Sequence, residues 1–136
     1  TVKDNILFGH ISEPFDEQRY QHTLECCSLK HDLQLLPKGD MTEIGEKGIT
    51  SSGGQKARVA LARVVYHNAN ISLVDDALSA VDAHVARDLF HNCIVKELMA
   101  DEDAQRSVIL VTNALQFLNH PRVDKIIVIQ DGRIAE

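Results

Sequence analysis

The feature that most constrains the fold is an alternation of short apolar runs and helical patterns in the second half of the 136-residue chain. Ile71 to Val74 is a brief apolar run that stops at Asp75 and Asp76, a pattern typical of a buried parallel strand that ends in a loop. A helical pattern follows from Ser79, because apolar residues recur every fourth residue in two adjacent rows. The rows are Val81, Val85, Leu89 and Cys93, and Ala86, Phe90, Ile94 and Leu98.

Further apolar runs continue the alternation. Val108 to Thr112 is predicted to be a second buried strand, and Ala114 to Leu118 one or two helical turns. Lys125 to Ile129 is predicted to be a third strand, and Asp131-Gly132 marks a hairpin turn. Strands that alternate with helices imply an α/β layer with a parallel sheet.

The first half of the chain has a different character. Phe15 to Leu29 carries a helical pattern that Glu13 or Asp16 could cap. Leu33 to Leu36 ends at Pro37, and residues 38–52, rich in Gly, Thr and charge, are predicted to form a long loop. A second helix is predicted over Gly53 to Tyr66, where apolar residues form one face.

Composition limits the classes of protein to consider. A mass of 15.1 kDa is enough for one compact domain, and 44% hydrophobic with 25% charged residues is ordinary for a globular chain. No apolar run approaches the ~20 residues of a membrane span. The net charge of -6 makes nucleic acid a poor partner. Cys26, Cys27 and Cys93 lack a C-x-x-C pair and are expected to be free, buried thiols in a reducing compartment.

The most informative motif is Ser52-Gly53-Gly54-Gln55 at the head of a predicted helix. Unpaired N–H groups at a helix N-terminus favour an anion, and glycines let a phosphate approach the backbone closely. A flexible helix start capped by Ser52 is the structural alternative, and so short a motif does not exclude it.

Polar residues also follow two predicted strands. Asp75 could orient a magnesium ion through water at the carboxyl end of its strand, and Asp76 is expected to point into the same crevice. Asn113 follows Thr112 at the end of the next strand, where ligands bind in open parallel sheets. Helix capping by the aspartates and an ordinary loop asparagine are the alternatives. A Gly-x-x-x-x-Gly-Lys-Ser/Thr phosphate loop does not occur in the sequence, so these residues do not form a complete ATP site by themselves.

The order of these motifs resembles that of an ABC transporter nucleotide-binding domain across nearly all of the chain. Residues 51–55 resemble the ABC signature, and Ile71 to Asp76 the Walker B strand. Ser79-Ala80-Val81-Asp82 is similar to the D-loop, and Thr42 to Gly48 to the x-loop of exporters. The closest similarity, in residues 75–84, is to the first nucleotide-binding domain of the multidrug-resistance-associated (C) branch.

The resemblance implies an α/β fold: a P-loop NTPase-like core with a parallel sheet plus a helical subdomain. Residues 1–52 would be the helical subdomain and x-loop, and residues 53–136 the Walker B, D-loop and switch-loop part of the core. Walker A, the adenine-stacking loop and the Q-loop glutamine would lie upstream of Thr1. In this family one domain's Walker motifs and another domain's signature enclose each ATP. Ser52, Gly53, Gly54, Gln55 and Asp82 would therefore serve a partner domain's ATP, and Asp75 its own domain's Mg²⁺.

Three positions depart from the family pattern. Asp76 stands where the family has a glutamate general base, and a displacement of order 1 Å at a reacting centre can cost ~100-fold. Asn113 stands where the switch histidine contacts the γ-phosphate, and an amide carries no titratable proton. Ser51 replaces the usual leucine of the signature. The resemblance thus implies a functional signature together with a degenerate Walker B site.

The expected function is part of the ATPase of an exporter, on the cytosolic face of a membrane, acting with a second nucleotide-binding domain and with transmembrane domains. The 136 residues alone are expected to be inactive. Asp76 and Asn113 leave open a regulatory module in which ATP holds domains together without hydrolysis. A chromosome-maintenance ATPase is the third alternative, although the exporter-like x-loop and the lack of coiled-coil heptads argue against it.

Overall fold

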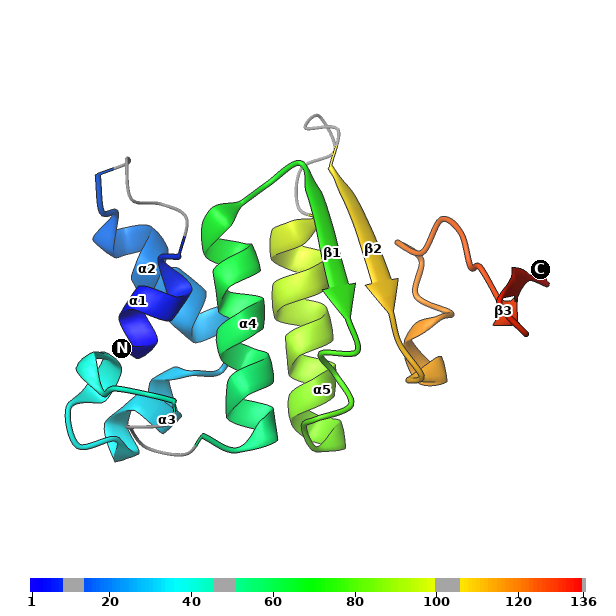
Figure 1. Cartoon of the computed structure of the whole chain (residues 1–136). Helices are drawn as coiled ribbons and strands as arrows, with labels where there is room; N and C mark the ends of the chain where they lie inside the picture. The colour runs from blue at the N-terminus through cyan, green and yellow to red at the C-terminus, as the bar shows by residue number, and fades with distance from the viewer. Residues whose placement is uncertain (9–13, 46–50, 100–105, 136) are drawn as a thin grey trace.

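The chain folds as helices packed against one face of a small parallel sheet, with a separate hairpin near the C-terminus (Figure 1). The computed structural model describes residues 1–8, 14–45, 51–99 and 106–135. The helices are α1 (Val2–Ile6), α2 (Glu17–Cys26), α3 (Lys30–Leu35), η1 (Gly39–Met41), α4 (Gly53–His67), α5 (Ala83–Leu89), η2 (Phe90–Leu98) and η3 (Leu115–Phe117). The strands are β1 (Ile71–Asp75), β2 (Ser107–Val111), β3 (Ile129–Gln130) and β4 (Arg133–Ile134).

Strands β1 and β2 confirm the predicted parallel pairing. Their register runs from Ile71 opposite Ser107 to Asp75 opposite Val111. The connection between them passes through α5 and η2, so the unit is a strand, a crossover helix and a parallel strand. The pairing continues one residue beyond β1, because the Asp76 N–H donates to the Val111 carbonyl oxygen over 2.9 Å. This bond ties the start of the loop after β1 to the end of β2.

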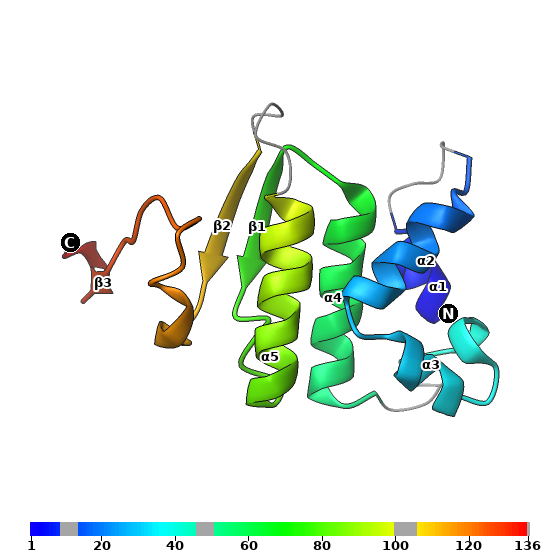
Figure 2. The ribbon, with the colours of Figure 1, turned by 180° about the vertical axis from the view of Figure 1, so that it is seen from behind.

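Helix α4 confirms the helix predicted from Gly53 and is one residue longer than expected. Ser52 and Gln55 form a capping box at its start, and Asn68 ends it in the left-handed region with φ 54°. Its buried residues are Val59, Leu61, Ala62, Val65 and Tyr66. One side of α4 receives α1 and α2, and the other faces α5 (Figure 2). The helix is therefore the centre of the core.

The helix predicted from Ser79 begins four residues later, at Ala83. The Ser79 N–H donates to the Asp76 carbonyl oxygen over 3.3 Å, so a turn occupies residues 76–79. Serine and aspartate favour such turns because their side chains compete with helical hydrogen bonds. From Phe90 the helix continues as η2 with π-type bonds, as in the 3.1 Å bond from the Met99 N–H to the Ile94 carbonyl oxygen.

The helix predicted over Phe15 to Leu29 is observed as the shorter α2. Of its two proposed caps, Asp16 does the capping, since its Oδ1 accepts from the Arg19 N–H over 3.0 Å. Glu13 lies outside the described residues. Tyr20 of α2 meets Tyr66 of α4 edge to face, with ring centroids 6.3 Å apart.

The prediction of a third parallel strand over Lys125 to Ile129 is wrong. Residues 123–128 have no strand pairing, and Ile129–Gln130 instead pairs antiparallel with Arg133–Ile134. An apolar run forms a ladder only beside another strand, and within the described residues none lies along this segment. The predicted turn is confirmed, because Asp131 and Gly132 both have positive φ, 50° and 73°, as a tight type I′ turn requires.

No helix among the residues that the structure describes is both long and apolar enough to cross a membrane.

Candidate functional site

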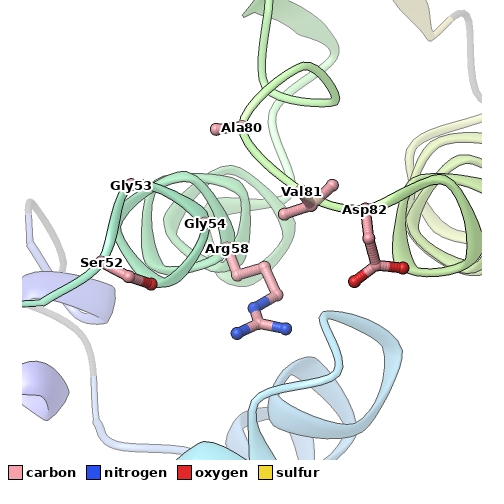
Figure 3. A pocket seen from close by; sticks show the side chains of 7 residues that line it. All are labelled: Ser52, Gly53, Gly54, Arg58, Ala80, Val81 and Asp82. Atoms are coloured by element: carbon pink, nitrogen blue, oxygen red, sulfur yellow. The ribbon is translucent and has the colours of Figure 1, made fainter.

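A pocket lies where the N-terminus of α4 meets the turn before α5 (Figure 3). It is lined by Ser52, Gly53, Gly54, Arg58, Ala80, Val81 and Asp82. Four of these residues come from the signature-like segment and α4, and three from the D-loop-like segment. The fold therefore brings together two motifs that are about 30 residues apart in the sequence.

Ser52 caps the N-terminus of α4 and leaves donors there that could bind an anion. Its Oγ accepts the Gln55 N–H over 3.2 Å, and the Gln55 Oε1 accepts the Ser52 N–H over 3.0 Å. The cap uses only acceptor capacity of the hydroxyl, so its O–H can still donate to a ligand. The N–H groups of Gly53 and Gly54 have no intrahelical acceptor, because they belong to the first turn. The predicted phosphate cradle and the predicted cap are thus compatible.

Gly54 is required by close packing between the two motifs. A Cβ built on Gly54 would lie 3.0 Å from the Ala80 carbonyl oxygen and 3.2 Å from Val81 Cγ1. A Cβ on Gly53 would meet nothing within 4 Å. Of the two glycines, Gly54 lets the helix approach the turn, and Gly53 leaves the backbone open toward the pocket.

Arg58 was missed by the sequence analysis and is the cation of this pocket. It lies one turn after Gly54 on the same helix face, a spacing that could have identified it. Its Nη2 is 2.8 Å from Asp32 Oδ2 on α3, and both side chains are only 15% exposed. Its Nε is buried and has no hydrogen-bond partner among the described residues. A buried donor without a partner leaves capacity for a ligand or an ordered water.

Gln55 is not among the residues that line the pocket. Its Nε2 donates to Asp32 Oδ1 over 3.0 Å, while its other amide atom completes the helix cap. Asp32 therefore holds both Gln55 and Arg58, one with each carboxylate oxygen. This carboxylate, also missed by the sequence analysis, fixes the orientation of the first turns of α4 against α3.

Asp82 lines the pocket and also caps α5. Its Oδ1 accepts the N–H groups of His84 and Val85, each over 3.1 Å. The backbone hydrogen bond from Val85, more than that from His84, lowers the pKa of Asp82 below its usual value. The carboxylate is exposed and lines the pocket (Figure 3), so its second oxygen is available as an acceptor for a ligand donor.

The predicted residues at the strand ends form a second group, which does not line the pocket. Asp75 is the last residue of β1, and Asp76 follows it with φ 47°, in the left-handed region. Asp76 is bonded to Val111, and Asn113 lies two residues beyond Val111, so the fold brings both predicted catalytic residues to one sheet end. Aspartate tolerates the left-handed region better than most residues.

The Asp76 carboxylate has one satisfied and one free oxygen. Its Oδ2 accepts the Ser79 hydroxyl over 2.7 Å, whereas its Oδ1 is buried without a partner among the described residues. An unpartnered buried oxygen fits a water molecule or a ligand donor at this position. Asp75 at the strand end supplies a second carboxylate, the ligand type that Mg²⁺ prefers. The two carboxylates are therefore of the ligand type that suits a hydrated Mg²⁺.

The x-loop-like segment is described only in part. Thr42 is buried and accepts the Val2 N–H at its carbonyl oxygen, over 3.1 Å. Residues 46–50, which include Glu46, Lys47 and Gly48 of the predicted x-loop, lie outside the described residues.

Comparison with known proteins gives the family. No protein-family model matches the chain. ABC transporter C family member 12 of Dictyostelium discoideum is 48% identical over 136 residues, which cover 100% of this chain and 10% of that protein. ATP-binding cassette sub-family C member 3 of Rattus norvegicus is 52% identical, and sub-family C member 2 of Homo sapiens 49%, each over 100% of this chain and 8% of the relative. The chain thus spans about a tenth of the length of these relatives. With about half of its residues identical over its whole length, the chain matches a segment of the C-branch transporters of the ABC family.

Proposed function

We propose that this chain is part of an ATP-binding domain that powers an exporter. The observation that carries the proposal is the pocket in which the N-terminus of α4 and the turn before α5 meet. Backbone N–H groups, a serine hydroxyl and an arginine surround it, and all three are donors suited to phosphate. The names of the relatives, which include ATP-binding cassette transporters, support the same class of function.

The pocket would serve the ATP of a second nucleotide-binding domain. Ser52, Gly53 and Gly54 would donate to the γ-phosphate oxygens, and the Asp32 carboxylate would keep Arg58 in place behind them. Gln55 would act by holding the helix start rather than by touching the nucleotide, because its amide is engaged with Ser52 and Asp32. Asp82 would receive a donor from the partner domain across the pocket.

The strand-end group would serve the ATP of this chain's own domain, at a site that hydrolyses slowly. Asp75 would hold Mg²⁺ through water, and the ion would neutralise phosphate charge. Asp76 would accept a proton from the attacking water, but its carboxylate is short and already accepts from Ser79. Asn113 would donate one hydrogen bond without carrying a proton. Both features weaken general-base catalysis.

The proposed arrangement assigns residues 1–52 to the helical subdomain and residues 53–136 to the core of one nucleotide-binding domain, with the first domain of a C-branch exporter as the preferred placement. Its partners would be a second nucleotide-binding domain and transmembrane domains, with the site on the cytosolic face of the membrane. Because this sequence has no lysine-containing phosphate loop, residues 1–136 alone would neither retain nor hydrolyse ATP.

The test is phosphate release by the full-length transporter that carries this sequence. Asp76→Glu combined with Asn113→His should increase turnover at this domain's own site, because both restore groups suited to moving a proton. Asp88→Glu, an equal lengthening on the outer part of α5, is the matched control and should leave turnover unchanged. Unchanged turnover in the double variant would contradict the degenerate site. Calorimetric titration of Mg-ATP into folded residues 1–136 should give no binding, and saturable binding would contradict the divided site.

A further inference from the structure

All three cysteines of the chain meet in the core, although Cys93 lies 66 residues after Cys27 and 67 after Cys26. Cys26 is the last residue of α2, Cys27 is its C-cap, and Cys93 comes from η2. The Sγ atoms of Cys27 and Cys93 are 3.4 Å apart, and those of Cys26 and Cys27 are 3.9 Å apart. All three sulfurs lie within 4.8 Å of one another, so they form one cluster, which we call the thiol triad.

These separations match a set of metal ligands. A metal–sulfur bond of about 2.3 Å places the sulfurs of a trigonal or tetrahedral site roughly 3.8 to 4.0 Å apart. The observed distances of 3.4 and 3.9 Å lie at or near this range. The third pair, Cys26 and Cys93, is within 4.8 Å, so shifts of at most about 1 Å would place an ion among the three sulfurs.

The surroundings select the kind of ion. Cys27 and Cys93 are 0% exposed and Cys26 7%, so the site is closed to bulk water. Among the described residues, no histidine, aspartate, glutamate or further cysteine joins the triad as a fourth ligand. Three sulfur ligands in an apolar enclosure favour a soft ion of low coordination number over Zn²⁺, whose structural sites have four ligands.

The thiols contact one another and the backbone. The Cys93 thiol donates to the Cys26 carbonyl oxygen over 2.8 Å, and its Sγ is 3.4 Å from that of Cys27. A thiolate is the form of cysteine that binds metals, so a bound ion would replace the thiol protons of the triad.

We propose that Cys26, Cys27 and Cys93 form a three-sulfur site for a soft monovalent metal ion, with Cu(I) as its type. Binding would form three metal–sulfur bonds and release the remaining thiol protons to solvent, without any change of oxidation state. The ion would connect the end of α2 to η2 and so cross-link two parts of the core that are distant in sequence. The proposal stands independently of ATP binding, because none of the three cysteines lines the pocket.

The test is an anaerobic titration of the reduced chain with Cu(I) in competition with a chromophoric Cu(I) chelator. We expect one ion per chain and an X-ray absorption spectrum with three sulfur neighbours. Cys93→Ala should weaken binding by at least about 100-fold, since even removal of groups behind metal ligands typically costs 10- to 100-fold. Ile94→Val is the matched control, because it trims the neighbouring buried side chain of η2 and keeps every thiol.

Circular dichroism of each variant establishes that it is folded before binding is compared. Retention of the wild-type affinity by folded Cys93→Ala would overturn the proposal, as would equal losses in Cys93→Ala and Ile94→Val. Nitrogen or oxygen neighbours in the absorption spectrum would place the ion elsewhere and would also overturn it. The thermal midpoint of the wild-type chain should rise with Cu(I), because an ion bound only by the native state stabilises it. That rise should be absent in Cys26→Ala.

Discussion

The backbone of Gly54 lies so close to the carbonyl oxygen of Ala80 that a Cβ at position 54 would be 3.0 Å from it. A contact this short is tighter than most real contacts of a Cβ, so the neighbouring backbone would have to give by a few tenths of an ångström. The relationship fixes how the start of α4 sits against the turn before α5, and so it shapes the pocket between them.

Gly54→Ala should therefore destabilise the chain despite the higher helix propensity of alanine. We expect a loss of about 1 to 3 kcal/mol in the free energy of unfolding, the usual cost of forcing an extra carbon into packed structure. Urea unfolding followed by circular dichroism measures it. Gly53→Ala is the control, because its Cβ would meet nothing within 4 Å and the change should be neutral or stabilising by up to about 1 kcal/mol. Equal stabilities of the two variants would show that the Ala80 contact does not constrain the helix.

Ser52→Ala should weaken the N-terminus of α4. The substitution removes the Oγ that accepts the Gln55 N–H, and loss of such a cap costs about 0.5 to 2 kcal/mol. Ser52→Thr keeps the acceptor and should recover most of the stability. Chemical denaturation of both variants provides the comparison, and an equally large loss in Ser52→Thr would mean that the cap is not the cause.

Asp32→Asn should weaken the contact between α3 and the first turns of α4. The partly buried guanidinium of Arg58 would lose its charge partner, and we expect a cost of roughly 1 to 3 kcal/mol in unfolding free energy. Glu25→Gln is the matched control, because it breaks the exposed pair with Lys30 and should have no measurable effect. If the two substitutions lower the unfolding free energy equally, burial of the pair between Asp32 and Arg58 contributes nothing to stability.

His22 should make the stability of the chain depend on pH. Its hydrogen bond to Glu97, with Nε2 and Oε1 2.8 Å apart, raises its pKa above the usual 6.5. The folded state then binds the proton more tightly than the unfolded state, so the stabilisation is complete below pH 6.5 and is lost as the pH rises through the folded pKa. The effect should be small because His22 is 56% exposed.

An NMR titration of the His22 ring should give this raised pKa directly. Glu97→Gln should return the pKa toward 6.5 and flatten the fall in unfolding free energy above that pH. A His22 pKa that does not respond to this substitution would rule out the ion pair as the cause.

Local patterns were sufficient to predict most of the elements. The four-residue apolar spacing after Ser79 corresponds to a helix in the structure, and the apolar run before Asp75 corresponds to a strand. The Asp131-Gly132 turn corresponds to a hairpin. Periodicity and turn chemistry act over a few residues, so they can be read from a single segment. The third strand failed because strand formation depends on a neighbour that no local pattern specifies.

The sequence by itself determined the family resemblance, the helix start at Ser52 and the strand end at Asp75, because each depends on residues adjacent in the chain. Only the tertiary structure decided that Asp32 holds both Gln55 and Arg58, that Gly54 meets Ala80, and that three cysteines share one place in the core. These contacts join segments between 23 and 67 residues apart, and they exist only because the packing of helices on α4 and η2 brings those segments together.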